Sequence, residues 1–456
     1  MSRGFYIETM GCQMNAHDSD FMAQSLIDSG FVPVSSPEQA DVILVNTCVV
    51  RAKPEQKAYS FLGRASGIKA ENPLKFLGII GCLAQMKGAD LLKRFPQLDL
   101  IMGPRELSRF PEIVKTIDRP SVKIVATHLD PAPPCHIPGH GCLRKKVTGY
   151  VSIMEGCNNF CSYCIVPYVR GRETSRSPKE IMAEAVHLLS HGVKEITLLG
   201  QNVNSYLWKG RGGRQRRNFP DLLSELSTLD GLLRLRFVTS HPKDLSDELI
   251  SCFGGIHNLC PHIHLPFQAG SNRILKLMRR GYTREDYMTL IQKLRAVKPD
   301  IAITSDVMVG FPGESDQDFE DTLGLIRYVR FDSLFSFTYS DRRGTAAEQM
   351  GDKIDDLTKA ARLNTLQNVQ KGITLEKNKE LEGKPAVILV EGGSKKGHQL
   401  SGRTDTYKIV NFIANDRLIG SLVNVKIKRS FLNSLWGEWI SSVLPNSQDL
   451  RDFGVM

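Results

Sequence analysis

Three cysteines within eight positions are the residues most able to do chemistry. Cys157, Cys161 and Cys164 form a Cys-x3-Cys-x2-Cys triplet shortly after an apparent strand that ends at Met154. Three thiolates on one tight loop can bind three irons of a cubane cluster, and the fourth iron stays open for a small ligand. A structural zinc site would need a fourth protein ligand close by, and the neighbouring sequence has no clear candidate. The triplet therefore favours a [4Fe-4S] cluster over zinc.

Three further cysteines are distant in sequence but follow three expected strands. Cys12, Cys48 and Cys82 are separated by 36 and 34 residues, close to one strand–helix unit each. Because the carboxyl ends of parallel strands meet at one edge of a sheet, these thiols should gather there. The alternative is that they are ordinary buried apolar residues. We interpret them as a second metal site, with iron–sulfur favoured over zinc by analogy with the first triplet.

Residues 1–125 alternate short apolar runs with amphipathic stretches, which predicts a parallel α/β domain with helices on both faces of its sheet. The expected strands are Phe5–Thr9, Val42–Asn46, Phe76–Ile80 and Leu98–Met102. The expected helices are Ser19–Ser29, Lys53–Lys69 and Ala84–Phe95.

A Pro/Gly-rich linker at 128–142 precedes a second alternation, which defines a domain at 143–375. Six strand–helix repeats predict a partial (β/α)6 barrel rather than a complete eight-unit one. The strands are expected at Gly149–Met154, Glu195–Leu199, Leu233–Val238, His262–Leu265, Ala302–Val309 and Ser333–Thr338. Helices are expected near Pro178–Ser190, Asp247–Cys252, Ser271–Met278, Arg284–Val297 and Asp316–Tyr328.

The C-terminal region changes from helix to short strands. Residues 355–379 resemble one long helix, and the β-rich runs Ala386–Glu391, Lys408–Phe412 and Leu422–Arg429 follow. They predict a small all-β barrel at 378–445. Between Asn378 and Ile440 stand 10 Lys and Arg against 6 Asp and Glu, a balance that suits a polyanionic partner.

Composition limits the class of protein. The 456 residues carry a net charge of +10, 41% are hydrophobic and 24% charged, as in globular proteins. Collagen-like, disordered and coiled-coil classes are excluded. No apolar run reaches the roughly 18 residues of a membrane span, and no signal peptide is visible, so a cytoplasmic protein without a membrane partner is expected. Ten cysteines in a reducing compartment indicate metal binding or catalysis rather than disulfides.

Several other residues leave alternatives open. Cys135, His136, His140 and Cys142 could be drawn as a zinc quartet, but they stand in the linker without supporting elements. Cys252 and Cys260 are expected to be core residues or spare thiols. The basic loop 208–217 is either a solvated loop or an RNA phosphate contact.

Eight segments of the chain resemble the motifs of one known family, the methylthiotransferases of the radical S-adenosylmethionine superfamily. They are Tyr6–Asn15, Val45–Cys48, Gly81–Gln85, Gly156–Arg176, Leu199–Tyr206, Ser240–Pro242, His264–Ser271 and Asp306–Glu314. The C-terminal barrel is similar to the family's TRAM domain, an OB-like RNA-binding module, notably at Gly402–Thr404 and Asn433–Leu435. The chain departs from the family at Ser340–Thr345, where Ser-Pro-Arg-x-Gly-Thr is often found.

The resemblance implies two [4Fe-4S] clusters and S-adenosylmethionine as cofactors. It implies that Cys157, Cys161 and Cys164 hold the radical-generating cluster. The N-terminal trio would hold an auxiliary cluster that carries the sulfur. One S-adenosylmethionine would supply the methyl group and a second the radical. Four residues at strand ends are expected to contact the cofactor: Gln201, Asn202, Ser240 and Gln268.

The resemblance also implies a substrate and partners. The opening Met10–Asn15 most resembles the branch that methylthiolates C2 of N6-isopentenyladenosine at tRNA position 37. The alternatives are methylthiolation of threonylcarbamoyladenosine in tRNA or of a ribosomal protein, or a non-enzymatic RNA-binding iron–sulfur redox sensor. The implied partners are the tRNA anticodon loop and an electron donor such as flavodoxin or ferredoxin. A monomer is expected.

Overall fold

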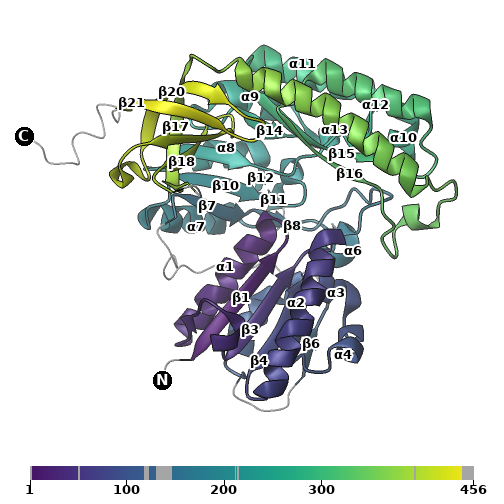
Figure 1. Ribbon diagram of the computed structural model, residues 1–456, viewed down its shortest axis with the longest axis vertical. Coiled ribbons are helices and arrows are strands. Elements are labelled where there is room, and N and C mark those ends of the chain that lie inside the picture. Colours follow the sequence, from purple (N-terminus) through teal and green to yellow (C-terminus); the bar gives the residue numbers. More distant parts are fainter. Residues whose placement is uncertain are drawn as a thin grey trace, which may run out of the picture.

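The protein consists of an N-terminal α/β unit, a central open barrel and a C-terminal β-barrel, connected in that order along the chain (Figure 1). The computed structural model describes residues 3–49, 52–117, 123–129, 146–210, 212, 215–394 and 397–443. This architecture confirms the predicted fold class. The exact domain boundaries, 1–125, 143–375 and 378–445, stay predictions, and most of the expected linker lies outside the described residues. Among the described residues, no helix is long and apolar enough to cross a membrane.

The N-terminal unit is built on a six-stranded parallel sheet of order β2-β1-β3-β4-β5-β6. The strands are β1 (Gly4–Met10), β2 (Val32–Pro33), β3 (Val42–Thr47), β4 (Phe76–Gly81), β5 (Leu100–Met102) and β6 (Ile124–Ala126). Every residue of β3 and β4 is buried, because helices cover both faces of the sheet. The four predicted strands are thereby confirmed, and two short edge strands join them.

The helices of this unit are α1 (Gln13–Asp28), α2 (Ala52–Glu71), α3 (Cys82–Lys87), α4 (Asp90–Arg94) and α5 (Phe110–Val114). The prediction of one helix over Ala84–Phe95 was wrong. Gly88 has φ +50°, a left-handed conformation that glycine adopts without strain, and it divides the segment into α3 and α4.

The central unit contains two three-stranded parallel sheets that together make six strands of an open barrel. The first holds β7 (Thr148–Ser152), β10 (Glu195–Leu199) and β13 (Arg234–Phe237), and the second holds β14 (His262–His264), β15 (Ala302–Val309) and β16 (Ser333–Thr338). A parallel bridge between Leu235 and Leu259 connects them. The predicted partial barrel is confirmed.

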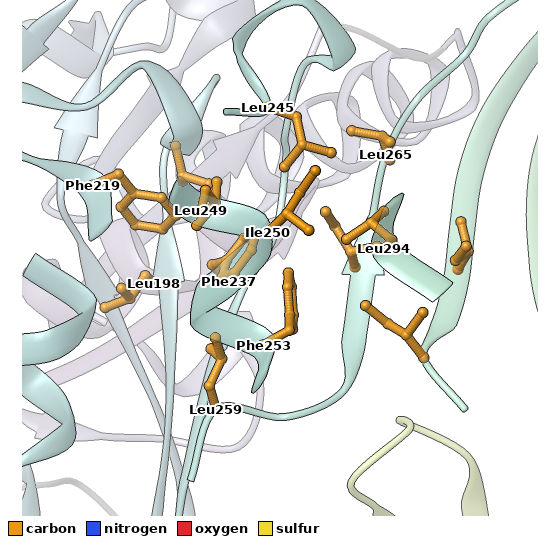
Figure 2. Packing of buried hydrophobic residues seen from close by; sticks show 14 of the residues in the cluster. Leu198, Phe219, Phe237, Leu245, Leu249, Ile250, Phe253, Leu259, Leu265 and Leu294 are labelled. Atoms are coloured by element: carbon orange, nitrogen blue, oxygen red, sulfur yellow. The ribbon is translucent and has the colours of Figure 1, made fainter. Parts of the chain in front are cut away.

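Helices cover the outside of this barrel: α7 (Pro178–Ser190), α8 (Phe219–Ser227), α9 (Asp247–Gly255), α10 (Asn272–Leu277), α11 (Arg284–Val297) and α12 (Asp316–Val329). In Figure 2, Phe237 lies among Phe219, Leu249, Ile250 and Phe253. Its ring centroid is 5.1 Å from that of Phe219 and 5.8 Å from that of Phe253. These aromatic contacts fasten helices α8 and α9 to the sheet.

Three elements near the basic loop were missed by the sequence analysis. Residues Leu207–Lys209 (β11) and Arg216–Asn218 (β12) form an antiparallel hairpin, and α8 begins immediately afterwards. The signal for α8 was a capping box, in which Asn218 and Asp221 exchange side-chain to backbone hydrogen bonds.

The C-terminal unit follows the long helix α13 (Asp356–Lys379) and is a closed five-stranded barrel of order β17-β18-β19-β21-β20. Its strands are β17 (Pro385–Gly393), β18 (Leu400–Thr404), β19 (Ile409–Ile413), β20 (Leu422–Ser430) and β21 (Leu435–Ser442). The sequence indicated only three of them. Strand β18 was missed because its glycine and polar residues weaken the strand pattern, and closure of the barrel required it.

Candidate functional site

The radical loop, residues 156–164, begins directly after the short strand β8 (Met154–Glu155). Gly156 has φ +84°, and a Cβ there would stand 2.1 Å from the backbone oxygen of Arg172, so only glycine fits. Its backbone N–H donates to Gln201 Oε1 over 2.5 Å. Further along, Ser162 donates its backbone N–H to Met278 and accepts from Ala347 with its carbonyl oxygen. The loop is therefore anchored at both ends before any cofactor binds.

The three thiols of the radical loop lie in a poorly hydrated environment. Cys161 is buried, while Cys157 and Cys164 are partly exposed. Burial raises the pKa of Cys157 to about 11 and that of Cys164 to about 12. These thiols are protonated at neutral pH until a metal displaces the proton, as thiol ligands of metals do. Buried Arg280, with Nη1 3.5 Å from Cys161 Sγ, adds a positive charge beside the loop.

The second cysteine trio collects at one edge of the N-terminal sheet, as predicted. In the parallel registers, Met10 is paired with Thr47, and Thr47 with Gly81. Cys12, Cys48 and Cys82 follow these three aligned positions, at the carboxyl ends of adjacent strands. Cys12 is exposed, whereas Cys48 and Cys82 are buried. The thiols thus line one edge and only the first faces solvent.

A buried amide network holds this edge. Asn15 Oδ1 accepts from both the backbone N–H and the thiol of Cys12, each over 3.2 Å. Asn15 Nδ2 donates to Asn46 Oδ1 over 2.8 Å, and Asn46 Nδ2 donates back to the Asn15 carbonyl over 2.8 Å. Gly81, with φ +97°, lets β4 approach closely, because a Cβ there would lie 2.7 Å from Asn46 Oδ1. The network positions Cys12 relative to the neighbouring strands.

The thiols of this second trio differ in acidity. Hydrogen bonding with Cys48 lowers the pKa of Cys12 to about 6, and the positive charge of Arg170 contributes. Burial raises the pKa of Cys82, although Arg170 opposes that shift too. Arg170 belongs to the central unit, so one cation of that unit acts on the cysteines of the other.

The four residues predicted at strand ends lie at the carboxyl end of the central barrel, but they do not all have the same role. Gln201 uses its side-chain oxygen to hold the radical loop, so it acts on loop position rather than as a free cofactor contact. Asn202, Ser240 and Gln268 are buried, and each keeps one side-chain polar atom without a hydrogen-bond partner in the described part of the chain: Oδ1, Oγ and Oε1, respectively. Buried polar groups are normally satisfied, so each of these atoms is a candidate contact for a polar ligand.

His241 belongs to the Ser240–Pro242 motif, but it was not one of the four residues expected to contact the cofactor. It is buried, its Nδ1 accepts from the backbone N–H of Lys243 over 3.2 Å, and its Nε2 has no partner among the described residues. Burial, together with the charges of Arg280 and Lys243, lowers its pKa to about 2, so the imidazole is neutral. With Nδ1 accepting, Nε2 carries the proton and can donate to a ligand. Its place beside Ser240 after a barrel strand was the available signal.

The donor sets fit iron–sulfur clusters. Within the described ranges, no three Cys, His, Asp or Glu side chains converge as ligands of a single metal ion. Thiolates on one ion stand about 4 Å apart, because each bond to zinc is about 2.3 Å long. In a cubane cluster each cysteine binds a different iron, which requires wider spacing. Each set provides three thiols, which is the donor chemistry of a [4Fe-4S] cluster that keeps one iron open.

The remaining cysteines take no part in either trio. Cys252 donates its thiol to the Glu248 carbonyl within α9. Cys260 is buried two residues before β14, at the amino end of the barrel strands, opposite the radical loop. The candidate zinc quartet, Cys135, His136, His140 and Cys142, lies outside the described residues.

A surface hollow of about 520 Å³ lies between β1 and α2 on the N-terminal unit. Met10 forms part of its wall and precedes Cys12 by two residues. Lys57 and Arg64 contribute two positive charges and Glu8 one negative charge, while Phe61 contributes an apolar surface. The hollow therefore combines cationic and apolar walls close to the only exposed thiol of the N-terminal trio.

The C-terminal barrel is attached to the central unit through buried arginines of β13. Arg234 donates to the carbonyls of Arg403 and Val387, and Arg236 donates to those of Asp405 and Thr404, over 2.6–2.9 Å. The side chain of Arg403 forms an ion pair with Glu391 and lies over the Tyr407 ring. Arg403, one of the ten cations counted in the barrel region, is therefore an interface residue. Lys426, Lys428 and Arg429 are exposed on β20.

Three family models match the chain, one for each unit. In chain order they are an uncharacterized protein family, UPF0004, at residues 4–103, the radical SAM superfamily at 151–326 and the TRAM domain at 379–440. These matches define a radical S-adenosylmethionine protein with an N-terminal cysteine-bearing domain and a TRAM module. Radical S-adenosylmethionine chemistry implies a [4Fe-4S] cluster and S-adenosylmethionine.

Curated relatives cover almost the whole chain. The tRNA-2-methylthio-N(6)-dimethylallyladenosine synthase of Syntrophus aciditrophicus is 50% identical over 440 residues, 95% of this chain and 94% of its own. Synthases of the same name from Geobacter metallireducens and Carboxydothermus hydrogenoformans are 48% and 45% identical, each over 95% of this chain and 97% and 99% of their own. The chain belongs to this family of radical S-adenosylmethionine methylthiotransferases, and the predicted resemblance is confirmed.

A solved structure supports the fold alone. The radical S-adenosylmethionine methyltransferase TsrM from Kitasatospora setae aligns with a TM-score of 0.55 at 16% identity, covering 76% of this chain and 74% of that one.

Proposed function

We propose that this enzyme adds a methylthio group to C2 of N6-isopentenyladenosine at position 37 of tRNA. The observation that carries the proposal is that two sets of three thiols, on two different units, accompany full-length similarity to synthases of that name. This similarity favours the isopentenyladenosine branch over the threonylcarbamoyladenosine and ribosomal-protein alternatives. Membership in an enzyme family argues against a purely redox-sensing protein.

Each group of residues has a role in the proposed reaction. Cys157, Cys161 and Cys164 hold the radical cluster, and Asn202, Ser240, Gln268 and His241 direct polar atoms at S-adenosylmethionine. The N-terminal trio holds the auxiliary, sulfur-carrying cluster. When bound, the two clusters and S-adenosylmethionine would supply the electron, the radical and the sulfur that the reaction needs. An aromatic C2–H is too weakly acidic to be deprotonated by a side-chain base. A base of the protein could therefore not replace the radical.

The protein's own contribution is placement and exclusion of water. Burial of Cys161 and Arg280, with partly buried Tyr163 beside them, keeps the radical site dry, which limits quenching of reactive species. Exposure of Cys12, beside the cationic hollow of Lys57 and Arg64, leaves the N-terminal trio open to a nucleic acid. A tRNA anticodon loop would therefore enter on this side, and exposed cations of the TRAM barrel would contact phosphates elsewhere. We further propose a monomeric, cytoplasmic enzyme reduced by a flavodoxin or ferredoxin.

Two reciprocal variants test the proposal. Replacing Cys157, Cys161 and Cys164 by Ala should leave about half of the iron and abolish 5′-deoxyadenosine formation. Replacing Cys12, Cys48 and Cys82 by Ala should preserve reductive cleavage of S-adenosylmethionine but give no methylthio product. The control is Cys252→Ser, which should retain both activities. Full iron in the first variant, or methylthiolated tRNA from the second, would remove the corresponding trio from the mechanism.

A further inference from the structure

Arg170 connects the two cysteine trios through both its backbone and its side chain. It ends the helix α6 (Val166–Arg170), which starts two residues after Cys164. On the same helix, Val169 packs in the core of the N-terminal unit, together with Cys82 and Leu83. The segment that leaves the radical loop is thus embedded in the other unit.

The side chain of Arg170 is buried between acids of the two units. Its Nη1 donates to Glu155 Oε1 of β8 over 2.9 Å, and its Nη2 lies 3.3 Å from Asp18 Oδ2 of α1. Helix α1 begins directly after Cys12. A buried arginine with partners on both sides holds them in fixed positions, because moving either acid away would leave a buried charge unpaired.

A second buried arginine, Arg105, holds the same segment, but its guanidinium occupies a different position from that of Arg170. Arg105 donates from Nε to the Arg170 carbonyl over 2.7 Å and from Nη2 to the Arg172 carbonyl. Its Nη1 also lies 3.4 Å from Thr174 Oγ1, so its partners lie on the segment that follows the radical loop, whereas the guanidinium of Arg170 acts electrostatically on Cys12 and Cys82. Arg105 therefore contributes to docking of the segment, and Arg170 contributes both to docking and to the charge beside the thiols.

We propose that Arg170 is a positioning residue for the N-terminal trio: it fixes that site relative to the radical loop and provides one buried positive charge to an anionic sulfur site. The inference rests on the proposed function, in that the trio binds an iron–sulfur cluster. Anionic thiolate-bound clusters are tuned by charges and hydrogen bonds around them, and loss of such outer partners costs about 10–100-fold in metal affinity or activity. The positive charge favours the reduced, more negative state of the cluster.

The test uses the full chain with Cys157, Cys161 and Cys164 replaced by Ala, so that all bound iron belongs to the N-terminal trio. Arg170→Met, Arg170→Lys and Arg105→Met are compared after anaerobic reconstitution. The readouts are iron content and the midpoint potential, from a redox titration followed by electron paramagnetic resonance. We expect a more negative potential in Arg170→Met, recovery of most of the shift in Arg170→Lys, and a near-native potential in Arg105→Met.

The same substitutions in the chain with all six ligand cysteines intact distinguish an effect on methylthio transfer from an effect on S-adenosylmethionine cleavage. Arg170→Met should lower methylthio product by about tenfold or more while S-adenosylmethionine cleavage without tRNA continues. An unchanged potential in Arg170→Met, or an equal shift in Arg105→Met, would overturn the inference. If Arg170→Met does not fold, Arg170→Gln, which keeps a hydrogen-bond donor but removes the charge, replaces it in the comparison with Arg105→Met. Absence of iron from the triple-cysteine parent would instead contradict the proposed second cluster.

Discussion

The guanidinium of Arg342 lies 3.6 Å from the carboxylate of Glu55, so the loop after β16 reaches helix α2 of the N-terminal unit. This loop is the segment Ser340–Thr345 that departs from the family pattern. The departure affects Asp341, which accepts from the Tyr339 hydroxyl over 2.7 Å and pairs with Lys353 over 2.5 Å. The loop is held by these new partners and still presents Arg342 to the other unit.

A double-mutant cycle can measure this contact between units. Both side chains are mostly buried, so Arg342→Ala and Glu55→Ala should show a coupling of about 1 kcal/mol in unfolding free energy. The exposed pair of Lys93 and Asp90, which lies within one helix, is the control and should show a weaker coupling, because solvent screens an exposed ion pair. Equal coupling in the two cycles would show that Arg342 and Glu55 do not join the units.

His17 should make stability depend on pH. Burial lowers its pKa, but the carboxylates of Asp18 and Glu184, 3.6 Å and 3.4 Å from its two ring nitrogens, outweigh that and raise the pKa to about 9. Because the folded pKa exceeds the ordinary value of about 6.5, the stabilisation is complete below pH 6.5 and is lost as the pH rises through 9. It amounts to about 3 kcal/mol.

The measurement is chemical unfolding of the metal-free chain from pH 6 to pH 10, for the native sequence and for His17→Gln. The difference in unfolding free energy between the two should shrink by up to about 3 kcal/mol over that range. Thiols and other groups titrate in both chains and cancel. A constant difference would mean that His17 is not protonated in the folded protein.

Gly156 should be irreplaceable in the radical loop. Alanine there meets the Arg172 carbonyl oxygen and requires a positive φ, so Gly156→Ala should destabilise the chain by about 2 kcal/mol or more and reduce iron loading of the first trio. Gly63 is the matched control, because it lies within α2 and an added Cβ meets nothing within 4 Å. Gly63→Ala should be neutral or stabilise by about 0.5–1 kcal/mol. The measurements are thermal unfolding and iron analysis, and normal loading in Gly156→Ala would contradict the steric argument.

The unpaired polar atoms at the barrel end should bind S-adenosylmethionine. Ser240→Ala and Gln268→Leu each remove one of them, and loss of a hydrogen bond in a buried site costs about 1–3 kcal/mol, or roughly 5–150-fold in affinity. Equilibrium binding to the reconstituted enzyme is the measurement, with Ser251→Ala on the exposed side of α9 as control. Unaltered affinity in both variants would place the cofactor elsewhere.

The TRAM barrel should contact tRNA phosphates through β20. Lys426→Ala with Arg429→Ala should weaken tRNA binding and reduce the slope of log affinity against log salt by about two, one for each lost phosphate contact. Substitution is preferable to deletion, because removing the barrel would strip Arg234 and Arg236 of their carbonyl acceptors. Lys93→Ala with Lys115→Ala, exposed on the N-terminal unit, is the charge-matched control. Equal slopes in the two double variants would exclude a specific role for β20.

Local sequence patterns were sufficient to predict most of the strands and helices and the positions of the two cysteine trios. Continuous apolar runs identified β3 and β4, because strands buried on both faces tolerate few polar residues. The sequence spacing of Cys12, Cys48 and Cys82 placed them after successive strands, and parallel topology then requires a shared edge. The triplet that ends at Cys164 could be predicted from the sequence because its three cysteines lie on one short loop.

Only the tertiary structure decided which polar residues meet across the units. Arg170 and Asp18 are 152 residues apart, and Arg342 and Glu55 are farther still, so no local periodicity records their contact. The same holds for Arg403, one of the ten cations counted in the barrel region, whose neighbours make it an interface residue, and for Gln201, which holds a loop. Such roles depend on burial and on the direction of side chains, which packing of the three units determines, whereas strands and cysteine spacing are set by short-range chemistry along the chain.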